Sequence, residues 1–369
     1  MILFSQVNLF SILSFFLSTH HLVLALAAVV AVVGHALTNK QTNERTNEQT
    51  NEQTIAGMQR ALVYNGPGAG SRSVNSAMDA LRRSLQPERV QVRTIDAQSL
   101  VSGGWEEDCV CLVMPGGADV PYCRELGMEG VERIRSWVEE DGGFYLGLCA
   151  GAYFASNKVV FERGDPVLEV IGERFLKFYS GTACGAVYPG FCYETERGAV
   201  AAPIRYLDWE TSIDMQGRIA QDVRWLSCRD YVNGGPYWLC RNDVNEVLRI
   251  HSVHPVLDNV DILATYPEKN HAVSAMKCTV KTGCAVLCSS HPELDSKMFL
   301  HGDMNAISDH LEKKTEGDAP SHYNSMYLHH VQALVRELDA NTSNRRALWN
   351  LLLAAGGLKS YLQSNIHTY

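Results

Sequence analysis

Between residues 59 and 151, short runs rich in apolar and β-branched residues alternate with amphipathic stretches. In those stretches apolar residues return every three or four positions, which favours helices with one buried face. Strands that alternate with helices over this length indicate a parallel sheet with helices on both faces. The predicted elements are the strands Ala61–Tyr64, Val90–Ile95, Cys109–Met114 and Phe144–Leu148, and the helices Val74–Leu85, capped by Ser73, and Gly130–Glu140.

The pattern becomes less regular after residue 158. Residues 158–249 are rich in Gly, Tyr and Trp and predict short strands and loops, which either cover one side of a cleft or form a scaffold of hairpins. We expect one flavodoxin-like α/β domain with a mainly parallel sheet over residues 58–300, and a helical tail over residues 301–369 packed on it. The later predicted elements are the strands Val260–Tyr266, Ala272–Val280 and Ala285–Ser289, the turn at 281–283, and the helices Tyr323–Leu338 and Arg345–Leu358.

The first 57 residues do not share this pattern. Residues 1–37 contain no Asp, Glu, Lys or Arg, and their most apolar part, Leu22–Val33, has the length of the apolar region of a signal peptide. Residues 38–57 hold a Thr-Asn-Glu-Gln-like repeat with nothing to bury, so we expect a disordered linker. Three interpretations stay open for residues 1–37. A signal peptide or a membrane anchor implies a secreted or membrane-anchored protein, whereas a true start at Met58 implies a cytoplasmic one.

Composition narrows the class of protein. Of the 369 residues, 46% are hydrophobic and 20% are charged, which is ordinary for a folded soluble protein. The formal net charge of -9 argues against a nucleic-acid partner, because a phosphate-binding surface requires clustered Lys and Arg. The 11 cysteines include no C-x-x-C pair, so we expect neither a disulfide framework nor a metal site. We also expect no cofactor.

The segment Gly143–Gly151 carries the main candidate chemistry. It begins as the buried strand Phe144–Leu148 and breaks into a G-x-C-x-G turn centred on Cys149. A strand, a glycine-flanked nucleophile and the start of a helix form a nucleophile elbow, which presents the side chain above the edge of the sheet. The helix start behind Cys149 also favours the thiolate. The alternative is a small buried cysteine beside packing glycines.

Two other motifs follow predicted strands. A Pro-Gly-Gly loop at residues 115–117 follows Cys109–Met114, and a His-Pro-Glu segment at residues 291–293 follows the strand Ala285–Ser289. In parallel sheets, functional residues gather beyond the carboxyl ends of the strands. We therefore expect both motifs to lie near Cys149.

In this order, the Pro-Gly-Gly loop, the G-x-C-x-G turn and the His-x-Glu segment resemble a class I glutamine amidotransferase-like domain. The finer similarity is to the amidotransferase-like domain at the N-terminus of eukaryotic biotin–protein ligases, and it covers roughly residues 58 to 300. The motifs that carry the resemblance are Tyr64-Asn65-Gly66-Pro67-Gly68, Pro115-Gly116-Gly117-Ala118-Asp119, Gly147-Leu148-Cys149-Ala150-Gly151, Gly181-Thr182-Ala183-Cys184-Gly185, Tyr188-Pro189-Gly190-Phe191, Tyr231-Val232-Asn233-Gly234-Gly235 and His291-Pro292-Glu293.

These residues allow nucleophilic catalysis. A thiolate needs a base to take and return its proton, and the base needs a third group to orient it. Cys149 fits the nucleophile, His291 the base and Glu293 the orienting group, and the resemblance assigns the same roles. The candidate donors of hydrogen bonds to an oxyanion are the backbone N–H groups of Gly116, Gly117 and Ala150.

Two hypotheses of function stay open. The first is a Cys-His-Glu hydrolase or amidotransferase that acts on a small amide such as glutamine. The second is a catalytically silent binding or regulatory module with the same fold, working with a separate partner protein. The chain contains neither a P-loop synthetase nor a glycine-arginine-rich biotin-binding motif. The resemblance therefore implies the amidotransferase-like module standing alone and does not make the chain a biotin ligase.

Overall fold

A computed structural model describes residues 58–238, 259–299 and 320–363. The chain divides into the compact units Met1–Met58 and Gln59–Tyr369, and every element described below belongs to the second unit. The signal peptide, anchor and linker expected within residues 1–57 fall outside the described residues, and so does the part of the predicted loop region from residue 239 onward.

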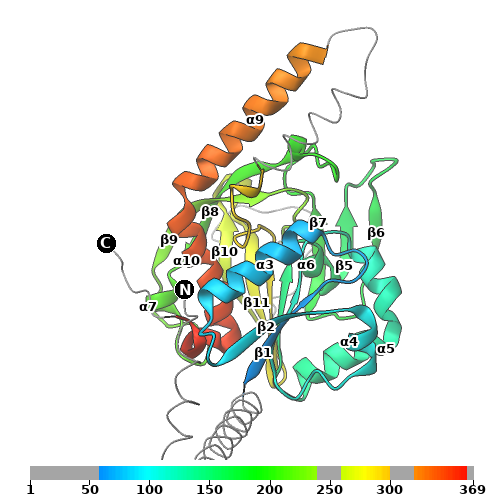
Figure 1. The fold of residues 1–369 in the computed structure, drawn as a ribbon, viewed down its shortest axis with the longest axis vertical. Coiled ribbons are helices and arrows are strands. Elements are labelled where there is room, and N and C mark those ends of the chain that lie inside the picture. Colours follow the sequence, from blue (N-terminus) through cyan, green and yellow to red (C-terminus); the bar gives the residue numbers. More distant parts are fainter. Residues whose placement is uncertain (1–57, 239–258, 300–319, 364–369) are drawn as a thin grey trace, which may run out of the picture. The chain divides into compact units, whose positions relative to one another are not determined.

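A nine-stranded sheet forms the centre of the second unit (Figure 1). Its strands are β1 (Gln59–Tyr64), β2 (Val90–Ile95), β3 (Cys109–Met114), β4 (Phe144–Leu148), β8 (Val200–Leu207), β9 (Trp225–Val232), β10 (Val260–Tyr266), β11 (Ala272–Val280) and β12 (Gly283–Cys288). They lie in the order β2-β1-β3-β4-β12-β11-β10-β8-β9. The half from β2 to β12 is parallel, and the half from β12 to β9 is antiparallel. β4, which leads to Cys149, therefore lies inside the parallel half.

Helices cover both faces of this sheet. The α-helices in the described part of the chain are α3 (Ser71–Ser84), α4 (Ala97–Ser102), α5 (Asp119–Glu139), α6 (Ala150–Phe154), α7 (Trp209–Ser212), α9 (Pro320–Ala340) and α10 (Thr342–Leu353). α3 and α10 pack on one face, where Leu81 and Leu352 join the same apolar core. α4 and α5 supply Leu100 and Ile134 to a second core on the other face. Burial of these apolar side chains is the main force that holds the layers together.

The predicted α/β class, with helices on both faces, is confirmed. Three strands of the parallel half, β2, β3 and β4, have the bounds that the sequence predicted. The sheet is mixed rather than parallel throughout, because the short turn at residues 281–283 joins β11 directly to β12. Parallel neighbours require a long crossover, so a connection this short makes the pair antiparallel.

Helices α3 and α5 start earlier than the sequence predicted, and their starts bear on the site. α3 has Gly70 in the N-cap position, so Ser73 lies inside the helix and does not cap it. α5 begins at Asp119 rather than at Gly130, because two helical stretches meet at a kink where Gly127 has φ 56°. Gly127 adopts this backbone angle without steric cost, and it hid the first stretch from the helical pattern.

A separate three-stranded sheet follows the turn at Cys149 and helix α6. It consists of β5 (Ser156–Phe161), β6 (Val170–Glu173) and β7 (Tyr179–Gly185), in the order β6-β5-β7. β5 begins two residues after α6 ends, so this sheet is tied closely to the turn that holds Cys149. These are among the short strands that the sequence predicted beyond residue 158, and Val159 and Phe161 line the site described below.

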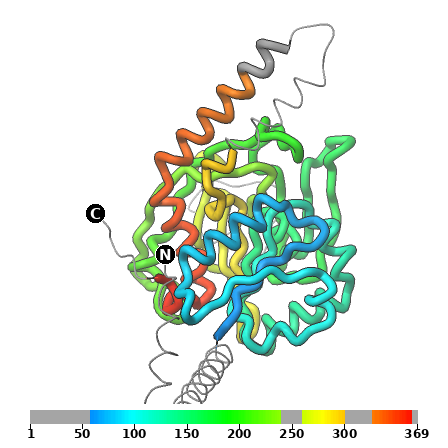
Figure 2. Tube along the Cα trace, in the orientation of Figure 1, coloured from blue at the N-terminus to red at the C-terminus, as the bar shows by residue number. Residues whose placement is uncertain are grey.

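The C-terminal tail packs on the sheet. Val331 and Leu338 of α9 join a third apolar cluster together with Tyr231 of β9. α10 continues into a π-helical turn at Ala354–Leu358, and its side chains pack in the same core as those of α3. Figure 2 shows α10, in red, close to α3, in blue. None of the helices in the described ranges is long and apolar enough to cross a membrane.

Candidate active site

Cys149 sits in a strained turn between β4 and α6. Its backbone has φ 47° and ψ -100°, a combination that a residue with a side chain adopts only at a cost of about 1–3 kcal/mol. The flanking glycines make the turn sterically feasible. A Cβ on Gly147 would lie 2.6 Å from the carbonyl oxygen of Gly151, and a Cβ on Gly151 would lie 2.1 Å from that of Met114. The G-x-C-x-G spacing is therefore a consequence of close backbone packing.

The sheet register brings the three motifs together. β4 pairs in parallel with β3 on one side and with β12 on the other. The loop at residues 115–117 follows β3, Cys149 follows β4, and His291 follows β12 after two residues. The backbone N–H of Cys149 also donates to the carbonyl of Cys288, at 2.8 Å, which fixes the elbow to the end of β12.

His291 and Glu293 form a buried pair beside Cys149. His291 Nδ1 lies 2.7 Å from Glu293 Oε1. Both residues are almost fully buried, with 6% and 1% of their surface exposed. Because an ionised carboxylate can only accept hydrogen bonds, Nδ1 carries the proton in this pair. Nε2 is then the ring nitrogen that remains for the hydrogen bond with Cys149.

The surroundings of His291 favour the imidazolium. Burial of the ring lowers the pKa of His291, but the Glu293 carboxylate and the hydrogen bonds to Cys149 and Glu293 outweigh this effect and raise the pKa well above its usual value. A cationic imidazolium next to a thiol favours the thiolate. The pair has the electrostatic arrangement that a cysteine nucleophile needs.

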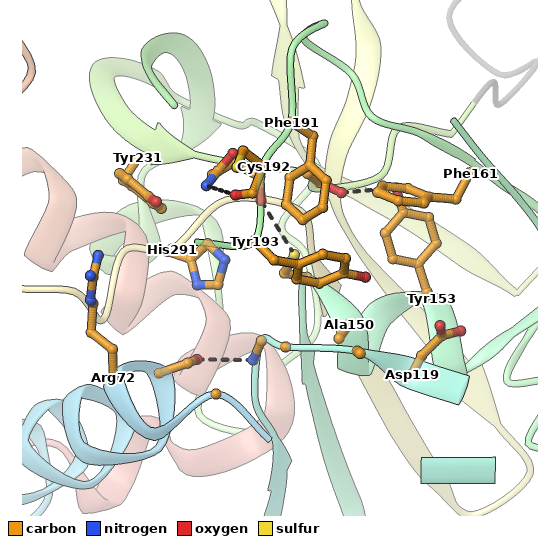
Figure 3. Close-up of a pocket in the computed structure, with 18 of the residues that line it drawn as sticks. Arg72, Asp119, Ala150, Tyr153, Phe161, Phe191, Cys192, Tyr193, Tyr231 and His291 are labelled. Carbon is orange, nitrogen blue, oxygen red and sulfur yellow. Dashed lines mark hydrogen bonds between the residues drawn. The ribbon is translucent and has the colours of Figure 1, made fainter. Parts of the chain in front are cut away.

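Cys149 opens into a cavity of about 550 Å³ whose two sides differ in chemistry. The apolar side is lined by Tyr153, Val159, Phe161, Val170, Phe191 and Tyr193. The polar side includes Arg72 and Tyr231, both of which contact the buried carboxylate of Glu196. Figure 3 shows His291 between the aromatic side chains on one side and Arg72 with Tyr231 on the other. Cys149 therefore lies where an apolar and a polar part of a ligand would meet.

Asp119 and Asn233 add polar groups to the cavity wall. The carboxylate of Asp119 pairs with Arg174, with Nε 2.6 Å from Oδ2. The Cys149 sulfur lies 4.0 Å from the backbone carbonyl of Asn233, whose amide donates to the carbonyl of Cys192 at 3.4 Å. Across the described ranges, no three His, Cys, Asp or Glu side chains gather as metal ligands would.

The three candidate oxyanion donors differ in availability. The Gly116 N–H, which the sequence named as a donor, donates instead to Ser73 Oγ at 2.9 Å. Gly117 and Ala69 lie opposite each other in an isolated antiparallel bridge. The hydrogen bonds of this bridge are donated by the N–H groups of Gly70 and Ala118, so the N–H of Gly117 is not used in it. Ala150 is the first residue of α6, where a backbone N–H has no partner within the helix.

Several residues of the site were not singled out from the sequence. Ser73 donates to Glu293 Oε1 at 3.1 Å, and Arg345 of α10 donates to the carbonyls of His291, at 3.0 Å, and Leu294, at 2.8 Å. A local motif contains only positions close in the chain, whereas Ser73 and Glu293 are 220 positions apart. The only signal for Arg345 in the sequence is its helical spacing from apolar residues, which places an arginine on an otherwise apolar helix face.

Comparison with known proteins places the chain in a family. The sequence model of the family described as "Biotin-protein ligase, N terminal" matches residues 59–362. The chain belongs to this family. The match covers the Cys149 turn, the His291 segment and most of the described tail.

Two curated relatives illustrate how much of the protein is shared. The biotin–protein ligase of Schizosaccharomyces pombe is 34% identical over 238 residues, which is 64% of this chain and 33% of the ligase. An uncharacterized protein of Chlamydia muridarum is 38% identical over 154 residues, or 41% of this chain and 59% of that protein. The chain thus matches about a third of the yeast ligase.

Among solved structures, a glutamine amidotransferase from Thermotoga maritima is 13% identical, with a TM-score of 0.41, over 81% of this chain and 98% of the other.

Membership of the ligase N-terminal family accounts for the boundaries of the folded unit. The family match begins at residue 59, where β1 begins, and ends at residue 362, in the last described turn. The tail is therefore part of the family's domain.

Proposed function

We propose that this protein is a cysteine-dependent hydrolase or amidotransferase that acts on the carboxamide of glutamine or of another small amide. The observation that carries the proposal is that Cys149 and His291 line the same cavity, with Glu293 bonded to His291 from behind. The strained backbone of Cys149 adds support, because strain of this kind is retained at functional sites.

The first half of the reaction makes a thioester. The Cys149 thiolate attacks the amide carbon and forms a C–S bond, while the N–H groups of Gly117 and Ala150 bind the oxyanion. One such donor is typically worth about 10²–10³ in rate. His291 gives the proton on Nε2 to the amide nitrogen, the C–N bond breaks, and ammonia or an amine leaves. Glu293 keeps the imidazole in place throughout.

The second half restores the enzyme. His291 takes a proton from water, and the resulting hydroxide attacks the thioester carbon. The C–S bond then breaks, the carboxylic acid leaves, and Cys149 returns to the thiolate. In a hydrolase the ammonia is released to solvent. In an amidotransferase it passes to an acceptor, which a separate partner protein would hold.

Trapping with an electrophile tests this proposal. A chloroketone analogue of glutamine should add once to the protein, and peptide mapping should place the adduct on Cys149. The nearly isosteric Cys149→Ser variant should keep the same melting temperature, take up no adduct and release no ammonia from amide substrates. The matched control, Cys123→Ser, should behave like the unchanged protein. Amide turnover that persists in Cys149→Ser would overturn the proposal.

A silent binding module is the competing outcome. The aromatic wall extends the cavity well beyond the sulfur of Cys149, which would suit a ligand that is held without reaction. In that case amides would raise the melting temperature of the protein and of Cys149→Ser equally, with neither an adduct nor ammonia.

A further inference from the structure

The hydroxyl of Ser73 is buried inside α3 and is turned toward the triad. Only 6% of the residue is exposed. Ser73 looked like a helix cap in the sequence, but Gly70 occupies the N-cap position. The hydroxyl is therefore not used to begin the helix.

The hydrogen bonds of Ser73 have a defined direction. Its oxygen accepts from the backbone N–H of Gly116 at 2.9 Å, and it lies 3.1 Å from Glu293 Oε1. A carboxylate oxygen can only accept, so the hydroxyl proton of Ser73 points to Glu293. The chain of donors runs from Gly116 through Ser73 to Glu293.

Two donors converge on one oxygen of the carboxylate. His291 Nδ1 and Ser73 Oγ both contact Oε1 of Glu293, at 2.7 and 3.1 Å. Within the described residues, the other oxygen, Oε2, is buried and has no hydrogen-bond partner. The final torsion of a glutamate side chain is intrinsically broad, so these two bonds fix the plane of the carboxylate. Without Ser73, His291 alone would hold it.

We propose that Ser73 is a positioning residue of the triad, whose hydroxyl fixes the Glu293 carboxylate and thereby the imidazole of His291. The role rests on the proposed function for its catalytic meaning, but the geometry stands without it. Ser73 also engages the N–H of Gly116 and so ties the Gly-Gly loop to the same network. This leaves Gly117 and Ala150 as the oxyanion donors.

Three variants isolate the hydroxyl. Ser73→Ala removes it, and Ser73→Thr keeps it. Ser76→Ala is the matched control, because Ser76 lies one turn further along α3, is 2% exposed and donates to the sulfur of Met298 at 3.0 Å instead of to the triad. Thermal unfolding of each variant checks that the domain stays folded.

Two measurements read out the position of the imidazole without requiring turnover. The first is the pKa of His291, followed by NMR of histidine-labelled protein. The second is the rate at which iodoacetamide alkylates Cys149 near neutral pH. Without the Ser73 bond the Glu293 carboxylate can turn away from His291 Nδ1, which weakens the contact that stabilises the imidazolium. In Ser73→Ala we therefore expect a lower pKa for His291 and alkylation about tenfold slower. Ser73→Thr and Ser76→Ala should both resemble the unchanged protein.

The outcomes separate this inference from the proposed function. An unchanged His291 pKa and alkylation rate in Ser73→Ala, or equal changes in Ser76→Ala, would overturn the positioning role even if amides are hydrolysed. The expected changes in a protein that hydrolyses no amide would support the positioning role and count against the proposed function. If Ser73→Ala does not fold, loss of the normal His291 pKa in the hydroxyl-retaining Ser73→Thr would overturn the role, and its retention would support it.

Discussion

At Gly116 the backbone passes directly against the imidazole of His291. A Cβ at this position would lie 2.4 Å from Cε1 of the ring, closer than two carbon atoms can approach. Gly116→Ala should therefore displace His291 and slow the alkylation of Cys149 at least about tenfold, because the base would leave its contact with the thiol. Gly172→Ala is the control, since its Cβ would meet only an Arg174 nitrogen at 3.4 Å. Equal alkylation rates in the two variants would show that Gly116 is not needed to place the base.

The pKa of His291 predicts a pH dependence of stability. The Glu293 carboxylate and the hydrogen bond to Cys149 outweigh burial and raise this pKa above its unfolded value of about 6.5. Between the two pKa values the folded state binds more protons than the unfolded state, so stability falls as the pH rises. The contribution of His291 is thus fully present below about pH 6.5 and is lost as the pH rises through the folded pKa. Urea unfolding of the protein and of His291→Gln should show a stability difference that shrinks with rising pH. A difference that does not change with pH would contradict the prediction.

Single residues of the site divide into those that the sequence indicates and those that it does not. Cys149, His291 and Glu293 belong to short motifs that follow strands, and the structure brings them together. The partners of the triad come from distant parts of the chain. Ser73 looked like a helix cap, and nothing local to Arg345 indicates that it supports the His291 loop. Their roles depend on tertiary contacts that no local pattern contains.

Helix α10 supports the loop that carries His291 through a buried ion pair. Arg345 Nε lies 2.6 Å from Asp230 Oδ1 of β9, and the side chains are 4% and 0% exposed. The other end of the guanidinium donates to the carbonyls of His291 and Leu294. An element far from Cys149 in the chain thereby fixes the loop that carries His291.

Removing this arginine should be costly. Arg345→Met leaves the charge of Asp230 buried and unpaired, and we expect a loss of about 3–5 kcal/mol in the free energy of unfolding. Arg346→Met, which changes the exposed neighbouring residue, should cost within about 0.5 kcal/mol. Adding Asp230→Asn to Arg345→Met should recover part of the loss, because it removes the buried charge. Urea unfolding measures all three. Similar losses for Arg345→Met and Arg346→Met would show that the ion pair between Arg345 and Asp230 does not stabilise the domain.

Strands outside the irregular region were easier to predict than those inside it, and β10 and β11 also have the predicted bounds. β3 and β4 are buried apolar runs, so local pattern alone sets their bounds. β8 and β9 pair with each other at one edge of the sheet. Both lie within residues 158–249, where the sequence pattern was too irregular to set their bounds. The helix start at Asp119 was missed because the kink at Gly127 interrupts the helical period. The pattern of apolar residues locates a helix or strand when the burial of that element follows one regular period from end to end.

At the scale of the whole molecule, the family match and the described domain share one boundary. The match begins at residue 59, directly after Met58. We expect residues 1–57 to be dispensable for folding, because their repeat has no apolar face to bury. A chain that starts at Met58 should melt within a few degrees of the full-length protein. A chain that also ends at residue 340 should not fold, because it lacks α10 and its buried leucines. If the chain that starts at Met58 and keeps its C-terminal end melts far below the full-length protein, the prediction is wrong.

The most direct test of the account is the relative reactivity of the cysteines. Iodoacetamide labelling near pH 7, followed by peptide mapping, gives a rate for each thiol. Cys149 should label first, and His291→Ala should slow it at least about tenfold, because the imidazolium favours the thiolate. Burial raises the pKa of Cys109 to about 12 and that of Cys123 to about 11, so both should react slowly. Cys192, which also lines the cavity, is replaced by serine to remove a competing thiol. If Cys149 labels no faster than Cys123, or if His291→Ala leaves its rate unchanged, the catalytic account is wrong and only the fold and the family remain.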